Sequence, residues 1–256
     1  MKGMSNILAL GCSFTWGESL QFFSGLDSVL WKKDRPQFPD TLKTLDDAQL
    51  NFIYQNRWPA LLAKQLGVEY ITKSSNGGSN MQSLNLATKF YNIPYNLENY
   101  KICILQVTEC SRDPFIFKLE SGEILKKTEY STMEYQRRVI GLNDDNIRND
   151  SYIYFYDKFY EFKTYLESNG IHVYIITYPQ DSVEILKTHK LYSNFVTLKY
   201  KENEYTSTDD LSLHHPMLVI ENYFADKNLN KGDNHLILEG HHIIANSIYN
   251  EIKKND

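Results

Sequence analysis

Short, strongly apolar segments recur at wide intervals along the chain, and segments with helical spacing separate them. The clearest apolar segments are residues 6–10 (NILAL), 101–107 (KICILQV) and 171–177 (IHVYIIT). Near-continuous apolar runs of this length are typical of strands buried on both faces of a parallel sheet. Strands that alternate with helices predict an α/β fold in which helices cover both faces of the sheet.

Weaker patterns complete this expected architecture. Residues 68–71 and 217–220 are two further candidate strands. The predicted sheet therefore has about five strands. Helical spacing is predicted over residues 57–66, closed by Gly67, and over residues 81–91, 151–168 and 238–252. The sequence therefore predicts a three-layer, flavodoxin-like α/β fold with a parallel sheet.

The length of 256 residues fits one large domain. We expect a single domain over residues 1–256 with two insertions. The first, around residues 21–56, contains prolines and a charged stretch and is expected to be a long loop. The second, around residues 115–150, contains Ser121, Gly122 and an NDDN run and is expected to be a hairpin or excursion outside the core.

Composition narrows the classes of partner. The net charge is -5, and no block of Lys or Arg forms a stripe that could follow a phosphate backbone, so nucleic acid is not an expected partner. The N-terminal apolar run is too short for a signal peptide and no stretch has 18 consecutive apolar residues, which predicts a soluble, cytoplasmic chain or one lacking its export signal, with no membrane partner. Three cysteines imply no disulfide framework, and the oligomeric state is left open.

The string GCSFTWG, residues 11–17, follows the first predicted strand. In an open parallel sheet the ligand crevice lies beyond the carboxyl ends of the strands, so Ser13 is expected at the rim of the sheet. A serine hydroxyl is a weak nucleophile that needs a base within hydrogen-bond reach. Taken alone, Ser13 fits a simple turn serine equally well.

A second string, GDNHLILEGHH at residues 232–242, precedes the last predicted helix. A loop at this place would reach the same rim as Ser13, and triad chemistry uses residues that are far apart in the chain. His235 is then the candidate base, and Asp233 could accept its second ring N–H and fix its tautomer. His241 and His242 lie on the helix and are expected to be core or solvated residues.

Together these strings resemble those of the SGNH, or GDSL-like, hydrolases, which have a Ser after strand one, a Gly in a second block, an Asn in a third and an Asp-x-x-His near the C-terminus. SNGGSN, residues 75–80, is similar to the second block, which places Gly78 at the glycine whose backbone N–H stabilises the oxyanion. The resemblance implies an esterase that uses Ser13 and His235.

Two blocks depart from the family pattern. After the third strand the chain reads QVTECSR where the family has Gly-x-Asn-Asp, so Thr108 or Glu109 stands near the place of the usual amide donor. The side chain of Asn80 is one candidate substitute and Thr108 is the competing donor, although Asn80 serves equally well as a turn residue. In the last block Asp233 lies two residues before His235 instead of three.

The resemblance implies hydrolysis of an O-acyl ester, often an acetyl ester, of a carbohydrate or similar polar alcohol. Two alternatives stay open: a lipase or lysophospholipase, and a catalytically silent module that binds glycan or protein. No cofactor is expected, because the chain has neither a Gly-x-Gly-x-x-Gly string nor a P-loop. No metal is expected either, because His214 and His215 have no partners at ligand spacing.

Overall fold

The computed structural model describes most of the expected core elements. The described residues are 6–17, 20, 47–74, 78–85, 99–110, 115–118, 124–127, 144–219, 222 and 235–255. Residues 21–46 of the loop expected over residues 21–56 therefore lie outside the described residues.

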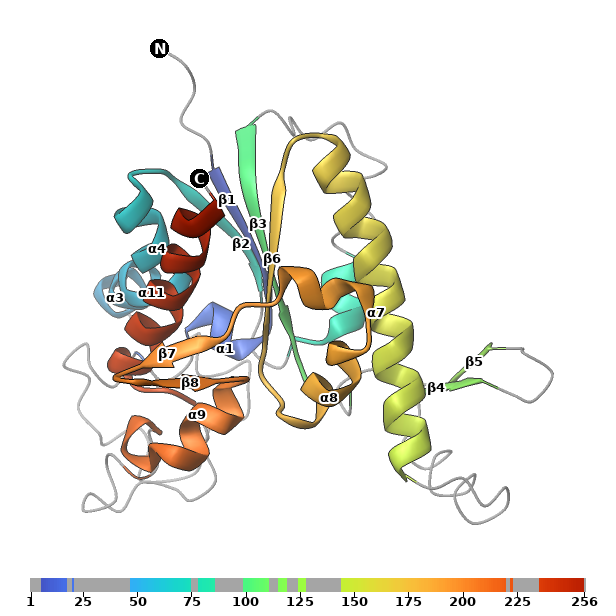
Figure 1. Ribbon diagram of the computed structural model, residues 1–256. Helices are drawn as coiled ribbons and strands as arrows, with labels where there is room; N and C mark the ends of the chain where they lie inside the picture. Colours follow the sequence, from blue (N-terminus) through green and yellow to red (C-terminus); the bar gives the residue numbers. More distant parts are fainter. Residues whose placement is uncertain are drawn as a thin grey trace.

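Four parallel strands form the central sheet in the order β2-β1-β3-β6 (Figure 1). Their bounds are Asn6–Gly11 for β1, Tyr70–Ser74 for β2, Tyr100–Val107 for β3 and His172–Thr177 for β6. Leu10 of β1 pairs with Leu105 of β3, and Val107 of β3 pairs with Thr177 of β6. The carboxyl ends of β1, β3 and β6 therefore meet at one edge of the sheet.

Helices cover both faces of the sheet, as the sequence predicts. Figure 1 shows α4 (Trp58–Leu66) and α11 (Leu238–Asn255) on one side, and α7 (Asp144–Ser168) and α8 (Asp181–Lys187) on the other. Alternate residues of β1 point to the two layers, because strand side chains alternate between faces. Ile7 and Ala9 join the core under α4 and α11, whereas Leu8 and Leu10 join the core under α7.

Helix α4 illustrates why these local predictions succeed. Trp58 and Leu62 are fully buried, one turn apart, as the apolar spacing predicts. The helix ends at Gly67, which has a φ of 67° and donates its backbone N–H to the last turn. Glycine adopts this left-handed conformation without the steric penalty that other residues incur.

Smaller elements extend this framework. The antiparallel hairpin of β4 (Phe115–Lys118) and β5 (Ile124–Lys127) matches the hairpin expected within the second insertion, and β4 contacts α7. A second hairpin, β7 (Leu198–Tyr200) and β8 (Asn203–Tyr205), packs on α11 and leads into α9 (Thr208–His214). Figure 1 shows the second hairpin on the α11 side of the sheet.

In the structure the C-terminal part of each expected insertion is helical. Residues 47–56, expected to be loop, form α3 (Asp47–Asn56), in which Ile53 is fully buried. Helix α7 begins at Asp144 rather than at Ser151, so the NDDN run starts the helix. Acidic residues are favourable in a first helical turn. The Arg148 Nε lies 3.2 Å from an Asp181 carboxylate oxygen, and this ion pair joins the added part of α7 to α8.

The expected fifth strand is wrong. Residues 216–218 form the 3-10 helix η6 (Pro216–Leu218), and only Val219 makes an isolated antiparallel bridge, to Leu236. Pro216 cannot donate a backbone hydrogen bond to a sheet, and Met217 remains 60% exposed. At the β6 edge of the sheet, Phe195 makes a single parallel bridge to Ile175. Phe195 directly follows the 3-10 helix η5 (Lys190–Asn194).

Within the parts of the chain that the structure describes, no helix combines the length and the apolar character that crossing a bilayer would require.

Candidate active site

Ser13 begins the short helix α1 (Ser13–Trp16) directly beyond the carboxyl end of β1. The turn that contains it is closed by a 3.0 Å hydrogen bond from the Thr15 backbone N–H to the Cys12 carbonyl. Cys12, Phe14 and Thr15 are all buried. This placement matches the position expected from the sequence, at the rim of the sheet where open parallel sheets bind ligands.

The residue after Ser13 contacts the candidate base. The rings of Phe14 and His235 are stacked, with centroids 4.7 Å apart and planes 28° apart. On its other side Phe14 contacts Tyr178, with ring centroids 4.3 Å apart. Tyr178 follows β6, so three segments that are distant in the sequence converge beside the turn that carries Ser13.

The chain around His235 is held by backbone pairing. Ile237 donates its backbone N–H to the Leu218 carbonyl at 2.8 Å, and Leu236 bridges to Val219. The turn into α11 also requires a glycine at position 240, because a Cβ there would lie 2.6 Å from the Leu236 Cβ. His235 itself is half-buried, so its ring contacts both protein and solvent. Asp233, its expected partner, lies outside the described residues.

The second block meets the end of β3 through Asn80. The side-chain amide of Asn80 donates to the Thr108 carbonyl at 2.9 Å, and its oxygen accepts from the Thr108 backbone N–H at 3.0 Å. Asn80 is fully buried and Gly78 is also buried. This paired hydrogen bond joins Asn80, two residues after Gly78, to Thr108 at the carboxyl edge of the sheet.

Thr108 carries an unusual hydroxyl. Its side chain is 1% exposed, and its Oγ1 has no hydrogen-bond partner among the described residues. Because buried hydroxyls are normally hydrogen-bonded, an unpaired one at a candidate site indicates a missing acceptor. Of the two donors considered from the sequence, Asn80 is engaged with the Thr108 backbone, whereas the Thr108 hydroxyl is unpaired within the described structure.

The histidines of the last helix behave as expected from the sequence. His241 is 1% exposed, and its Nδ1 accepts a 3.3 Å hydrogen bond from the Trp58 backbone N–H. Burial lowers the pKa of His241 to about 3, and the nearby His235, His242 and Arg57 add to this effect. A neutral, buried histidine that accepts from a helix N-terminus has a structural role. His242 is exposed.

Gln106 is a residue that we did not predict. It lies on β3 beside the end of β1, and its Oε1 accepts from the Thr15 hydroxyl and from the Cys12 thiol, with a Cys12 Sγ to Oε1 distance of 3.7 Å. Both donors flank Ser13 in the sequence. The available signal was a single uncharged polar residue in the apolar run KICILQV, which places a polar side chain in a buried strand.

A cavity of about 670 Å³ lies beyond the carboxyl ends of β3 and β6. Its lining combines polar and apolar surface and contains four carboxylates and one arginine. The lining residues are Glu109, Cys110, Arg148, Tyr152, Pro179, Gln180, Asp181, Glu184, Thr206 and Asp209. Burial raises the pKa of Asp209 to about 6, and the charge of Glu109 adds to this effect.

This cavity borders the residues described above. Glu109 directly follows Thr108, and Pro179 directly follows Tyr178. Asp209 donates its backbone N–H to the Tyr178 carbonyl at 3.1 Å. The cavity therefore adjoins Tyr178, which packs on Phe14, at the same edge of the sheet.

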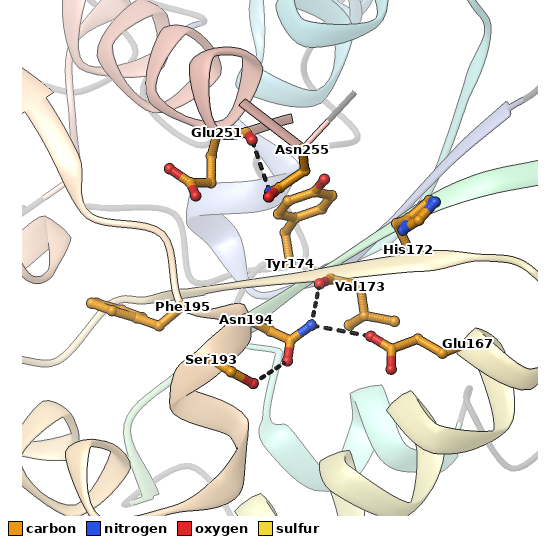
Figure 2. A pocket seen from close by; sticks show the side chains of 9 residues that line it. All are labelled: Glu167, His172, Val173, Tyr174, Ser193, Asn194, Phe195, Glu251 and Asn255. Atoms are coloured by element: carbon orange, nitrogen blue, oxygen red, sulfur yellow. Dashed lines mark hydrogen bonds between the residues drawn. The ribbon is translucent and has the colours of Figure 1, made fainter. Parts of the chain in front are cut away.

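A smaller cavity of about 270 Å³ lies at the amino end of β6, away from the carboxyl edge of the sheet (Figure 2). Figure 2 shows Asn194 pointing across it, where its amide donates to the Val173 carbonyl at 2.8 Å and to Glu167 at 3.1 Å. These hydrogen bonds cover a backbone carbonyl of an edge strand, which explains the polar lining in structural terms.

His214 and His215 each have a local partner. His214 Nδ1 lies 2.9 Å from the Asp210 carbonyl, and His215 Nε2 lies 2.6 Å from the Tyr205 hydroxyl. Across the described ranges, no three His, Cys, Asp or Glu side chains gather in an arrangement that could hold a metal ion.

No protein-family model and no curated protein matches the chain. Solved structures do match it, and they include a GDSL-like lipase from Bacteroides thetaiotaomicron VPI-5482, with 14% identity, a TM-score of 0.43, and 98% of this chain and 89% of that chain covered. The esterase EstA from Pseudoalteromonas sp. matches with 10% identity, a TM-score of 0.43, and 98% and 97% coverage.

A family two carbohydrate esterase from Clostridium thermocellum, solved in complex with cellohexaose, matches with 11% identity and a TM-score of 0.47, over 100% of this chain and 66% of that chain. At these identities the likeness is one of overall fold.

Proposed function

We propose that this protein is a serine ester hydrolase in which Ser13 is the nucleophile and His235 is the general base. The observation that carries this proposal is the stacking of His235 on Phe14, with centroids 4.7 Å apart. It joins the two strings of the sequence to which we assign the nucleophile and the base, and it does so at the carboxyl edge of the sheet. Nucleophilic catalysis by serine needs this convergence.

In the proposed reaction the Ser13 hydroxyl attacks the ester carbonyl while His235 takes its proton. The tetrahedral intermediate collapses when His235 returns the proton to the leaving alcohol. Water then hydrolyses the acyl-serine by the same two proton transfers in turn. Asp233 would orient the imidazole and stabilise its protonated form.

The developing oxyanion needs preorganised donors. We assign the backbone N–H groups of Ser13 and Gly78 to this role. The third donor would come from the Asn80 and Thr108 pair. Their mutual hydrogen bonds support a division of roles in which Asn80 fixes the end of β3 and the unpaired Thr108 hydroxyl supplies the donor.

The substrate in this proposal is an O-acyl ester, such as an acetyl ester, of a carbohydrate or similar polar alcohol. Support comes from the cavity of about 670 Å³ beside the site, whose carboxylates, Gln180 and Arg148 can exchange hydrogen bonds with hydroxyl groups. These groups would give a polar alcohol several hydrogen-bond partners in the cavity.

Reaction with a fluorophosphonate probe tests the proposal, because only an activated serine is labelled. We expect the wild-type protein to be labelled and Ser13→Ala to be unlabelled, and we expect nitrophenyl acetate to be hydrolysed faster than long-chain nitrophenyl esters. A preference for long chains would favour the lipase alternative. An unlabelled, well-folded wild-type protein would favour a catalytically silent binding module, which the missing third-block Asn makes a real alternative.

A further inference from the structure

The side chain of Gln106 lies across the turn that carries Ser13. Its Oε1 accepts two hydrogen bonds, from the hydroxyl of Thr15 and from the thiol of Cys12 at 3.7 Å. Cys12 is the residue before Ser13, and Thr15 is two residues after it. One amide oxygen on β3 thus contacts the turn on both sides of the candidate nucleophile.

Gly11 makes this arrangement possible. A Cβ at position 11 would lie 2.8 Å from the Gln106 Oε1 and 2.9 Å from the Gln106 Cβ, and it would also meet the Thr15 hydroxyl. Any larger residue at the end of β1 would therefore displace Gln106 or Thr15. The first glycine of GCSFTWG leaves room for a buried amide from the neighbouring strand.

The side-chain amide of Gln106 is a polar group buried in the core. Gln106 is 1% exposed, and its Nε2 has no hydrogen-bond partner among the described residues. A buried amide N–H without a partner is unfavourable, so packing alone would be served better by an apolar residue at this position. The acceptor function of the oxygen is the feature that an apolar residue would lose.

We propose that Gln106 is a positioning residue that holds the turn between β1 and α1 and thereby sets the place of the Ser13 nucleophile. The catalytic part of this inference rests on the function proposed above. The uncharged amide accepts two hydrogen bonds without placing a negative charge beside the site where the oxyanion develops, which a carboxylate in the same place would do.

The test is a double-mutant cycle between Gln106 and Thr15. Gln106→Met keeps the length and apolar volume of the side chain but removes the acceptor, and Thr15→Val removes the donor with little change of shape. We expect each change to slow fluorophosphonate labelling about tenfold. The double variant should be no slower than Gln106→Met alone, because that change already removes the hydrogen bond to Thr15 together with the one to Cys12. Ile104→Val, on the same face of β3, is the packing control and should label at the wild-type rate.

Hydrogen–deuterium exchange across residues 11–17 gives a readout that does not depend on activity. We expect faster exchange in Gln106→Met and Thr15→Val than in Ile104→Val. Gln106→Glu keeps an acceptor oxygen at this position, so exchange across residues 11–17 should stay closer to the wild-type rate than it does in Gln106→Met.

The outcomes separate the two proposals. If the wild-type protein is labelled and Gln106→Met matches it in both labelling and exchange, the positioning role is wrong and the proposed function stands. Additive losses in the cycle would also overturn positioning through Thr15. If the wild-type protein is not labelled, the proposed function and the catalytic consequence of Gln106 both fail, whereas faster exchange in Gln106→Met would still establish that Gln106 holds the turn.

Discussion

The imidazole of His235 stacks on the ring of Phe14, with ring centroids 4.7 Å apart. An N-terminal and a C-terminal segment therefore meet beside the residue that we assign as the nucleophile. Phe14 is itself 2% exposed and is packed against Tyr178. A rigid aromatic ring therefore supports one face of the imidazole, which limits the orientations that the candidate base can adopt.

Alanine substitutions of the three histidines near the C-terminus should distinguish a catalytic role from a structural one. We expect His235→Ala to reduce ester hydrolysis nearly as far as Ser13→Ala does, because the base is lost. His242→Ala should keep most activity, because the side chain is exposed. His241→Ala should keep its activity per folded molecule but lower the thermal midpoint. Rates on nitrophenyl acetate, measured beside thermal melts, distinguish these results, and an essential His241 or His242 would show that the last block is misassigned.

His241 should also make stability depend on pH. Burial holds its folded-state pKa at about 3, below the unfolded value of 6.5. As the pH falls from about 6.5 towards 3, the unfolded chain binds a proton that the folded chain does not, so the free energy of unfolding decreases in this range. His241→Asn keeps an acceptor for the Trp58 N–H and removes the titration. Urea denaturation at pH 4 and pH 7 should therefore show a smaller pH difference in the variant than in the wild type.

Asp233 tests the short spacing of the last block. Loss of the orienting carboxylate costs about 10⁴-fold in rate where it fixes the histidine tautomer. We expect a smaller loss in kcat for Asp233→Asn, because the spacing from Asp233 to His235 is one residue shorter than the Asp-x-x-His spacing of the family pattern. A loss of the full size would show that the short spacing still builds a complete triad.

Thr108 and Asn80 should respond in different ways. Thr108→Val removes a buried hydroxyl that has no partner within the described chain, so stability should be unchanged or slightly higher. If the hydroxyl is the third oxyanion donor, kcat should fall roughly 10² to 10³-fold with little change in KM. Asn80→Ala removes both hydrogen bonds to the Thr108 backbone and should lower stability as well as kcat.

Steady-state kinetics and thermal melts of both variants check this pair of expectations. A silent Thr108→Val with a damaging Asn80→Ala would identify Asn80 as the donor. If neither variant changes kcat, two backbone N–H groups suffice and neither side chain contributes to the oxyanion hole.

Gly11→Ala should be destabilising, because the added methyl group meets the side chains of Gln106 and Thr15. Overpacking of this kind costs about 1 to 3 kcal/mol. Thr15→Ala should recover part of the loss when it is combined with Gly11→Ala, because it removes one of the two obstacles. Gly67→Ala is the control, since its cost comes from the backbone conformation alone and should be independent of Thr15. Urea midpoints of Gly11→Ala, Gly67→Ala and Thr15→Ala, and of each glycine variant combined with Thr15→Ala, measure the coupling, and full additivity in the Gly11 pair would contradict the proposed clash.

The local elements could be predicted where a short-range pattern determines them. The apolar runs that became β1, β3 and β6, the helical spacing of α4 and α11, and the glycine that ends α4 each depend on residues within a few positions of one another. Burial on both faces of a strand, or on one face of a helix, leaves its periodicity in the sequence. The positions of Ser13 and His235 relative to these elements followed from the same patterns.

Only the tertiary structure decided which distant residues meet, because the order and register of the strands depend on the packing of the whole chain. The Asn80 contact with Thr108 and the Gln106 contact with Thr15 arise from that register, and no local pattern signals either one. The first turns of α7 make an ion pair between Arg148 and Asp181 of α8, and Val219 is held by a single bridge to Leu236 instead of a sheet. Sequence spacing determined which segments fold into strands and helices, whereas long-range hydrogen bonds and packing decided how those segments build the site.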